Sequence, residues 1–270
     1  MRTLVRVIQN ALKYKSQIFQ LAKAAQKRKY KGSDLGILWA FAKPAMYAFV
    51  FYLAISLGFR HAKNIDGLYV PYFCWLITGM FAWFYMSSMI TGGGYCFKKY
   101  RAIVRNMRFP TDTVPVVNCV SELFIHVPIM LILMGAMCIF GIFPNIYYLQ
   151  LPIYTALMVI FSIFWNFAIG SIASLSKDIN NFLGTIGQAL FWLSGIIFDI
   201  NKVGSPMVQK IFYFNPITYI VNGYRNSLCM RIWIWEQPVQ LACFAGMLIM
   251  MLLVGMFFYS RLRKVLPDIL

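Results

Sequence analysis

Long apolar segments alternate with short polar ones along the chain. Six of these segments hold about the 20 apolar residues that an α-helix needs to cross the hydrocarbon core of a bilayer. They span residues 36–59, 69–90, 114–143, 149–176, 179–198 and 237–260. Several contain Pro or Gly, which spanning helices tolerate when neighbouring groups satisfy the freed backbone. The pattern therefore predicts an all-α integral membrane protein with six transmembrane helices.

The composition supports a membrane location. Of the 270 residues, 60% are apolar and only 12% are charged, whereas soluble domains contain about 45–50% apolar and about 25% charged residues. A single water-soluble enzyme domain is therefore not expected. The six cysteines form no C-x-x-C pair and lie mostly in apolar segments, so the sequence predicts neither a metal site nor a disulfide scaffold.

Basic residues outnumber acidic ones by 25 to 8, and their distribution predicts the orientation in the membrane. Nineteen of the 25 lie within residues 1–43, between the second and third segments, after the fourth, or after the sixth. Positive charge collects on the cytoplasmic side of membrane proteins. We therefore expect a multi-pass protein of the cytoplasmic (inner) membrane with both termini in the cytoplasm. A nucleic-acid-binding protein would instead carry its basic charge on a soluble face.

The uncharged stretch from 211 to 224 is the exception to the six-span pattern. It contains Pro216, and its 14 residues would rise only about 21 Å as a helix, less than the ~30 Å hydrocarbon core. If it crossed, the basic C-terminal tail would lie outside, against the charge distribution. We interpret it as a re-entrant or interfacial hairpin on the outer face, between the fifth and sixth spans.

Residues 2–27 separate into an apolar face and a basic face at helical spacing. The apolar face holds Leu4, Val7, Ile8, Ala11, Tyr14, Ile18, Ala22 and Ala25. Lys15 alone departs from the pattern, and its aliphatic stem allows this. A basic amphipathic helix ahead of a first span typically lies in the cytoplasmic headgroup layer. The sequence leaves open whether residues 1–35 form only a surface anchor or a gate or docking helix beside the transmembrane domain, residues 36–270.

The segment from Cys96 to Phe109 also has two faces. An apolar stripe lies opposite Lys98, Arg101, Arg105 and Arg108, before Pro110 ends the helix. We expect a two-sided cytoplasmic coupling helix between spans two and three that docks a soluble motor protein through Tyr100, Arg101, Ile103, Val104, Arg105 and Met107. The alternative is a solvated basic linker. No G-x-x-x-x-G-K-S/T motif occurs, so the chain has no phosphate loop for ATP hydrolysis.

Glu122 and His126 stand four residues apart in the third span and therefore share one helical face. Ionisable groups inside a membrane face the bundle interior and pair with partners or carry function. We interpret the pair as interhelical hydrogen bonding, with a proton relay as the alternative. The eight acidic residues are scattered singly, without the clustered carboxylates or the nucleophile and base of a catalytic site, so an enzyme is not expected.

Several short strings carry a resemblance to a known family. They are Tyr30-Lys31-Gly32-Ser33-Asp34-Leu35-Gly36-Ile37-Leu38-Trp39, Met107-Arg108-Phe109-Pro110, Lys177-Asp178-Ile179, Tyr213-Phe214-Asn215-Pro216, Tyr224-Arg225 and Arg263-Lys264-Val265-Leu266-Pro267-Asp268-Ile269-Leu270. In this order they resemble the membrane subunit of ABC exporters for lipid-linked cell-surface polymers, the teichoic-acid and O-antigen permeases of the ABC-2 type. The family-motif positions are Lys177, Asp178, Asn215, Pro216, Tyr224 and Arg225.

The resemblance implies a half-transporter. It would pair with a copy of itself and with two separate ATPase subunits, which would bind the ATP and Mg²⁺, while this chain would hold no cofactor. The cargo would be an undecaprenyl-diphosphate-linked polymer, teichoic acid or a related polysaccharide, in a channel lined partly by aromatic side chains. Four basic residues at the inner mouth would attract the pyrophosphate: Lys23, Lys27, Arg28 and Lys43.

Two positions depart from the family pattern. Lys177 replaces an arginine before the aspartate, which keeps the charge but loses the bidentate fork. Glu122 stands where close relatives tend to carry a basic residue. Two alternative functions remain from the sequence: an exporter of the same architecture that carries a drug or small lipid, and a membrane enzyme of polymer assembly.

Overall fold

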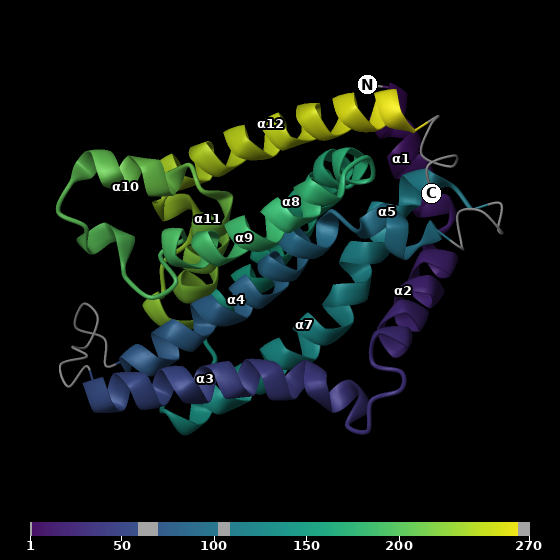
Figure 1. Ribbon diagram of the computed structural model, residues 1–270. Helices are drawn as coiled ribbons and strands as arrows, with labels where there is room; N and C mark the ends of the chain where they lie inside the picture. The colour runs from purple at the N-terminus through teal and green to yellow at the C-terminus, as the bar shows by residue number, and fades with distance from the viewer. Residues whose placement is uncertain (1, 59–69, 102–108, 264–270) are drawn as a thin grey trace.

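The computed structural model describes residues 2–58, 70–101 and 109–263, and within these ranges it contains no strand. Figure 1 shows a bundle of long helices with three other helices gathered at one end of it. These are α1 (Arg2–Lys13), α2 (Lys15–Lys29) and α5 (Cys96–Lys99). The fold class predicted from the sequence, an all-α integral membrane protein, is confirmed.

Among the described residues, five helices are long and apolar enough to cross a membrane. They are α3 (Trp39–Gly58), which follows the 3₁₀ turn Gly36–Leu38, α4 (Tyr72–Gly93), α7 (Val114–Ile139), α8 (Leu151–Ala173) and α12 (Pro238–Leu262). These helices correspond, within a few residues at each end, to the first, second, third, fourth and sixth predicted spans.

The fifth predicted span, 179–198, is only partly correct. Helix α9 (Lys177–Leu193) runs back along α8 (Figure 1) and has 17 residues, which rise about 26 Å, less than the ~30 Å hydrocarbon core. The chain turns after it at Gly195, which takes a left-handed conformation with a φ of 63°. An added Cβ there would meet the side chain of Ile200. The residues after Leu193 therefore form a turn rather than the end of a span.

The hairpin predicted at 211–224 is a pair of helices. They are α10 (Pro206–Tyr213) and α11 (Pro216–Arg225), and the π-helical turn Asn226–Met230 follows them. Pro216 suits the first position of α11 because it has no N–H to satisfy there. Asn215 caps the helix by accepting a hydrogen bond from the Ile217 N–H at 3.0 Å. Helix α11 is buried against α4, α8 and α12, which fits the re-entrant rather than the interfacial interpretation.

Helix α4 forms the centre of the bundle. It contacts α3, α7, α8, α9 and α11, and most of its side chains are buried, including Leu76, Met80 and Met86. Helix α3, by contrast, leaves nearly all of its described side chains open, with Tyr47 56% and Phe49 54% exposed. Because apolar surface of this extent is unfavourable in water, it must face lipid or another subunit.

The predicted amphipathic helix 2–27 is two helices that meet at Tyr14, whose ring packs edge-on against Phe109. Most of its predicted apolar face is at least partly buried against the bundle, and Ile8 is 51% exposed. The projection assumed one straight helix, and the bend at Tyr14 changes which face of α1 meets the bundle. Helix α2 packs along α7, so this segment is more than a surface anchor.

Helix α1 is attached through the buried carboxylate of Asp112, in the 3₁₀ turn Thr111–Thr113 ahead of α7. Asp112 Oδ2 lies 3.0 Å from Arg6 Nε and accepts a hydrogen bond from Asn10 Nδ2, also at 3.0 Å. Its other oxygen accepts a hydrogen bond from the hydroxyl of Tyr259 on α12. One carboxylate therefore joins the first helix, the start of α7 and the last helix at the same end of the bundle (Figure 1).

Candidate functional site

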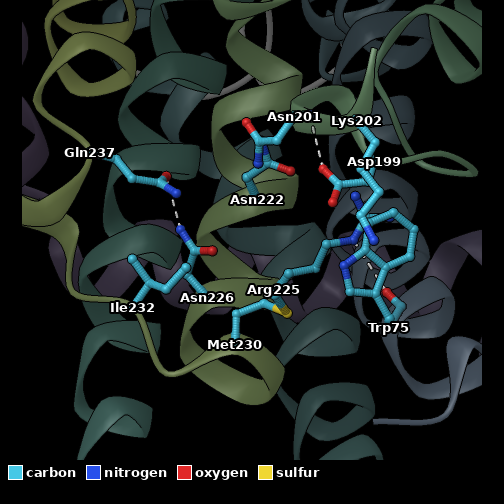
Figure 2. A pocket seen from close by; sticks show the side chains of 10 residues that line it. All are labelled: Trp75, Asp199, Asn201, Lys202, Asn222, Arg225, Asn226, Met230, Ile232 and Gln237. Atoms are coloured by element: carbon cyan, nitrogen blue, oxygen red, sulfur yellow. Dashed lines mark hydrogen bonds between the residues drawn. The ribbon is translucent and has the colours of Figure 1, made fainter. Parts of the chain in front are cut away.

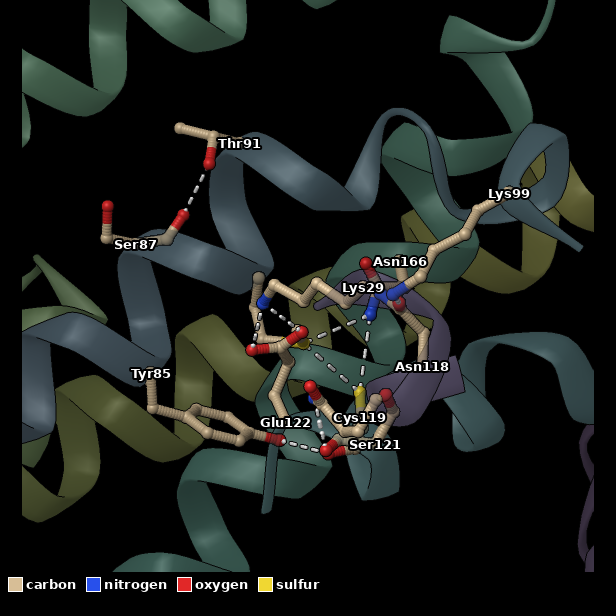
Figure 3. A network of polar contacts seen from close by, with 12 residues as sticks. Lys29, Tyr85, Ser87, Thr91, Lys99, Asn118, Cys119, Ser121, Glu122 and Asn166 are labelled. Carbon is tan, nitrogen blue, oxygen red and sulfur yellow. Dashed lines mark hydrogen bonds and ion pairs between the residues drawn. The ribbon is translucent and has the colours of Figure 1, made fainter. Parts of the chain in front are cut away.

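A polar junction connects α2, α5 and α7 (Figure 3). Lys29 at the end of α2 forms an ion pair with Glu122 of α7, with Nζ 2.9 Å from Oε1 and 3.0 Å from Oε2. Lys99 of α5 donates from Nζ to the side-chain oxygen of Asn118 on α7 at 3.1 Å. Arg28 of α2 donates to the Lys99 carbonyl at 3.3 Å. The junction therefore ties the N-terminal helix to the start of the predicted coupling segment.

Burial in the junction affects the chemistry of Lys99. Desolvation lowers the pKa of its ammonium group, while the nearby Glu122 carboxylate acts in the opposite direction. The partly buried ammonium group is held in place because it donates to Asn118. Lys99 therefore serves as an anchor between α5 and α7 rather than as a freely solvated surface charge.

The predicted docking residues fall into two groups. Ile103, Val104, Arg105 and Met107 lie outside the residues that the structure describes. Of the other two, Arg101 is exposed, whereas Tyr100 is only 1% exposed and packs in the apolar cluster between α2, α5 and α7. In the described structure Tyr100 holds the segment against the bundle and does not present its own surface to a partner.

A cavity of about 220 Å³ lies beside the junction, and we call it the inner cavity because the sequence predicts that this end of the bundle faces the cytoplasm. It is lined by the end of α2, the first turns of α3 and the middle of both α4 and α7. The charged and imidazole groups that line it are Lys29, Lys43, Glu122 and His126. Six aromatic residues form much of the remaining wall: Tyr30, Trp39, Tyr47, Phe81, Phe84 and Tyr85.

The basic residues that line the inner cavity differ from those predicted at the inner mouth. Of the four predicted residues, only Lys43 lines it, while Lys23, Lys27 and Arg28 are exposed on other faces of α2. Lys29 lines it and was missed by sequence reasoning. Glu122 could have indicated that a basic residue such as Lys29 lies nearby, because a carboxylate inside a span requires a cationic or hydrogen-bonding partner.

Glu122 and His126 do not pair with each other but with different parts of the chain. His126 Nε2 lies 2.8 Å from the hydroxyl oxygen of Tyr224 on α11, and that hydroxyl lies 2.7 Å from the hydroxyl of Thr155 on α8. Glu122 meets Lys29 instead. Each of the two residues therefore makes its own contact with another helix, as the interpretation of interhelical hydrogen bonding required. The contact of His126 joins Tyr224 to the third span.

Arg225 is buried at the opposite end of the bundle, where backbone carbonyls hold its guanidinium group. It donates from Nη1 to the Gly195 carbonyl at 2.7 Å and from Nη2 to the Ile196 carbonyl at 2.5 Å. Its Nε donates to the Trp75 carbonyl at 3.2 Å, and Cζ lies 3.3 Å from the centre of the Trp75 ring. Arg225 therefore links α11 to the turn after α9 and to the first turn of α4.

An outer cavity of about 230 Å³ adjoins this arginine (Figure 2). Most of its lining is polar: Asp199, Asn201, Lys202, Asn222, Arg225, Asn226 and Gln237, with Trp75, Met230 and Ile232 completing it. Asn226 donates to Gln237 at 3.0 Å across one side of it. The two cavities thus differ in chemistry, because the inner one is aromatic and cationic whereas the outer one is rich in amides.

Comparison with known proteins decides the family. Residues 16–229, well over half of the chain, match the family model described as ABC-2 type transporter. The chain belongs to this family. Members of the ABC-2 type transporter family are membrane subunits of exporters and not enzymes themselves, and an ABC exporter includes an ATPase partner. The resemblance seen in the sequence is therefore confirmed.

Three relatives of this ABC-2 permease carry the same description, "O-antigen export system permease protein RfbA". The protein from Myxococcus xanthus is 21% identical over 226 residues, covering 82% of this chain and 84% of its own length. Two proteins from Klebsiella pneumoniae are 23% and 22% identical over 246 residues, covering 90% of this chain and 91% of their own length. These relatives match nearly the whole ABC-2 permease.

The remaining family-motif positions of the ABC-2 permease lie at helix ends. Asn215 caps α11 and also donates to the Leu193 carbonyl at 3.1 Å and to the Ser194 hydroxyl at 2.9 Å, which ties α11 to the end of α9. Lys177 and Asp178 are exposed in the first turn of α9. An acidic residue there is favoured by the positive end of the helix dipole.

Proposed function

We propose that this ABC-2 permease is the transmembrane subunit of an ATP-driven exporter that moves a lipid-linked cell-surface polysaccharide across the cytoplasmic membrane. The lipid would be undecaprenyl diphosphate. The observation that carries the proposal is the agreement over nearly the whole chain with three relatives that are all described as O-antigen export permeases. For the same reason an O-antigen type of polysaccharide is favoured over teichoic acid as the cargo.

The functional unit would be a homodimer with two copies of a separate ATPase subunit that binds ATP and Mg²⁺. Apolar side chains left exposed on α3 and α9 support a second copy, including Phe49 on α3 and Phe182 and Trp192 on α9, which are 54%, 62% and 64% exposed. Burial of such rings is favourable. Aromatic rings along the interface between two copies would also suit sugar rings that slide through a channel.

The ATPases would dock at the end of the bundle that carries α1, α2 and α5, with both termini in the cytoplasm. ATP binding would close the ATPases and displace the segment that contains Arg101, and α5 would pass this displacement to α7 through Lys99 and Asn118. The same displacement would reach α2 because Arg28 bonds the Lys99 carbonyl. The interface between the two copies would then open a path for the polymer.

Docking is tested by the paired charge reversal Arg101→Glu and Arg105→Glu. Co-purification of the permease with its ATPase and the ATP hydrolysis that the permease stimulates are the measurements, and we expect both to be lost. The matched control is Lys210→Glu, which reverses an exposed charge on α10 at the opposite end of the bundle. Unchanged co-purification in the paired variant would remove the docking proposal.

The cargo is tested in cells that lack their own O-antigen permease. Co-expression of this chain with its ATPase partner subunit should restore lipid-linked polysaccharide at the cell surface. Export of a drug or small lipid without surface polysaccharide would contradict the proposed substrate class. Appearance of a glycerol-phosphate or ribitol-phosphate polymer instead would assign teichoic acid.

A further inference from the structure

We propose that the outer cavity binds one sugar unit of the polymer as the chain leaves the permease, through hydrogen bonds between its amide side chains and the sugar hydroxyls. The proposal rests on the proposed function and deepens it, because it names a place where the cargo is held inside a single copy of the chain. This place differs from a channel between two copies, where aromatic rings would contact the faces of sugars without hydrogen-bonding to individual hydroxyls.

The lining of the outer cavity offers the groups that sugar hydroxyls need. Four of its ten residues are amides, and three others are charged; the amides are Asn201, Asn222, Asn226 and Gln237. Each amide side chain carries two N–H donors and a carbonyl acceptor, and a hydroxyl both donates and accepts. An anion such as phosphate would use only the donors, and it would meet the carboxylate of Asp199 in the same cavity. The lining therefore favours a neutral ligand that is rich in hydroxyl groups.

Two of the lining side chains are almost completely buried, so the polar lining is built into the fold. Arg225 is 2% exposed and Asn226 is 5% exposed. A guanidinium group has five N–H donors, and three of those on Arg225 have acceptors in the part of the chain that the structure describes, all of them backbone carbonyls. A ligand hydroxyl would therefore accept a further hydrogen bond from Arg225 without displacing the three that hold it.

The size of the cavity suits one sugar ring. Its volume is about 230 Å³. Since a water molecule occupies about 30 Å³ in the liquid, this is room for roughly seven water molecules. A pyranose ring with its hydroxyls displaces a similar volume, whereas a disaccharide is too large. The cavity would therefore hold a single unit while the rest of the polymer passes outside it.

The cavity also brings together segments that are distant in the sequence. Its lining comes from the 3₁₀ turn Ile200–Lys202, the re-entrant helix α11, the π-helical turn and the residue that precedes α12. Figure 2 shows these side chains around the cavity. A bound sugar would connect α11 to the turn after α9. A polymer that emerges one unit at a time would be held there against sliding back.

The experiment uses the full chain in lipid nanodiscs and saturation-transfer NMR, which detects weakly bound ligands. The probes are the methyl glycosides of glucose, galactose, mannose, rhamnose and N-acetylglucosamine, with inorganic phosphate as the anionic competitor. We expect glycoside binding to the unchanged chain. Asn222→Leu, which removes an amide and fills part of the cavity, should weaken it about tenfold.

The substitution at Asn222 is chosen because it should leave the fold intact. Asn222 is only half-buried, and its hydrogen bond to Gln240 is long, at 3.5 Å. The matched control is Asn181→Leu, the same change at an exposed position of α9 outside the cavity, which should bind the glycoside like the unchanged chain. If Asn222→Leu lowers the melting temperature, Asn201→Ala, at an exposed lining position, repeats the test.

Each outcome decides the proposal. Weaker glycoside binding by the cavity variant than by Asn181→Leu, at an unchanged melting temperature, supports the site. Equal binding by the two variants, no binding of any glycoside to the unchanged chain, or displacement of the glycoside by inorganic phosphate would overturn it.

These results are separable from the export experiment, because none of them requires transport. Export of surface polysaccharide without glycoside binding would overturn the sugar site and leave the proposed function standing. Glycoside binding that depends on Asn222, in a permease that exports only a drug or small lipid, would overturn the proposed function and leave a sugar site.

Discussion

His126 Nε2 lies 2.8 Å from the hydroxyl oxygen of Tyr224, and this contact joins the third span to the re-entrant helix α11. The same hydroxyl meets Thr155 of α8 at 2.7 Å, so one buried phenol connects three helices. His126 shares a face of α7 with Glu122, which is paired with Lys29 of α2. Helix α7 therefore stands between the N-terminal helix and the re-entrant helix, and it bonds to both.

Removal of the Tyr224 hydroxyl should destabilise the bundle. Tyr224→Phe leaves the side chains of His126 and Thr155 without their shared partner, and we expect a loss of about 1–3 kcal/mol in the free energy of unfolding. Unfolding in mixed detergent micelles measures it. The control is Tyr148→Phe, because the Tyr148 hydroxyl is buried without a hydrogen-bond partner among residues 2–58, 70–101 and 109–263, and its removal should cost little. Equal effects of the two variants would contradict the role assigned to Tyr224.

Gly79 on α4 leaves the space that the Arg225 guanidinium group occupies. A Cβ at this position would lie 2.6 Å from Arg225 Nη2, so Gly79→Ala should displace the guanidinium group from the carbonyls of Gly195 and Ile196. We expect a loss of about 1–3 kcal/mol in the free energy of unfolding, as for other overpacked cores. Gly135→Ala on α7 is the control, since its Cβ would meet nothing within 4 Å in the part of the chain that the structure describes. A Gly79→Ala variant as stable as that control would refute the close approach.

Asp112 should determine whether α1 stays attached to the bundle. Asp112→Asn removes the charge that meets Arg6 and weakens the hydrogen bonds from Asn10 and Tyr259. We expect faster amide hydrogen exchange in α1 and little change in α8, as in a local opening. Asp34→Asn, at an exposed acidic position between α2 and α3, is the control. Exchange in α1 that stays slow in Asp112→Asn would show that apolar packing alone holds the helix.

The orientation in the membrane predicts which ends of the bundle an impermeant thiol reagent reaches. In a variant whose six native cysteines are replaced by serine, Ser205→Cys, exposed ahead of α10, should react from outside intact cells. Lys13→Cys, exposed at the end of α1, should react only after the cells are opened. The reverse pattern would place both termini outside and would remove the basis for ATPase docking at α5.

Much of the fold could be predicted from local pattern. The apolar segments gave the approximate positions of α3, α4, α7, α8 and α12, because a helix that crosses a bilayer needs a set length of apolar residues whatever its neighbours are. The shortened α9 could not be predicted, because the left-handed Gly195 that follows it is stabilised by packing against Ile200 and by the Arg225 hydrogen bond to its carbonyl. The hydrogen bond from Arg225 joins residues 30 apart in the sequence, so it cannot be seen in the local pattern.

The sequence predicted which residues belong to the candidate site, but it did not predict how these residues are arranged. The sequence by itself determined the class of protein, the helices and the identity of unusual groups such as Glu122 and Arg225, because composition and periodicity are properties of the chain. Only the tertiary structure decided the partners: Lys29 for Glu122, Tyr224 for His126, and backbone carbonyls for Arg225. Burial obliges each of these groups to find a partner, but which partner it finds depends on how helices distant in sequence pack together.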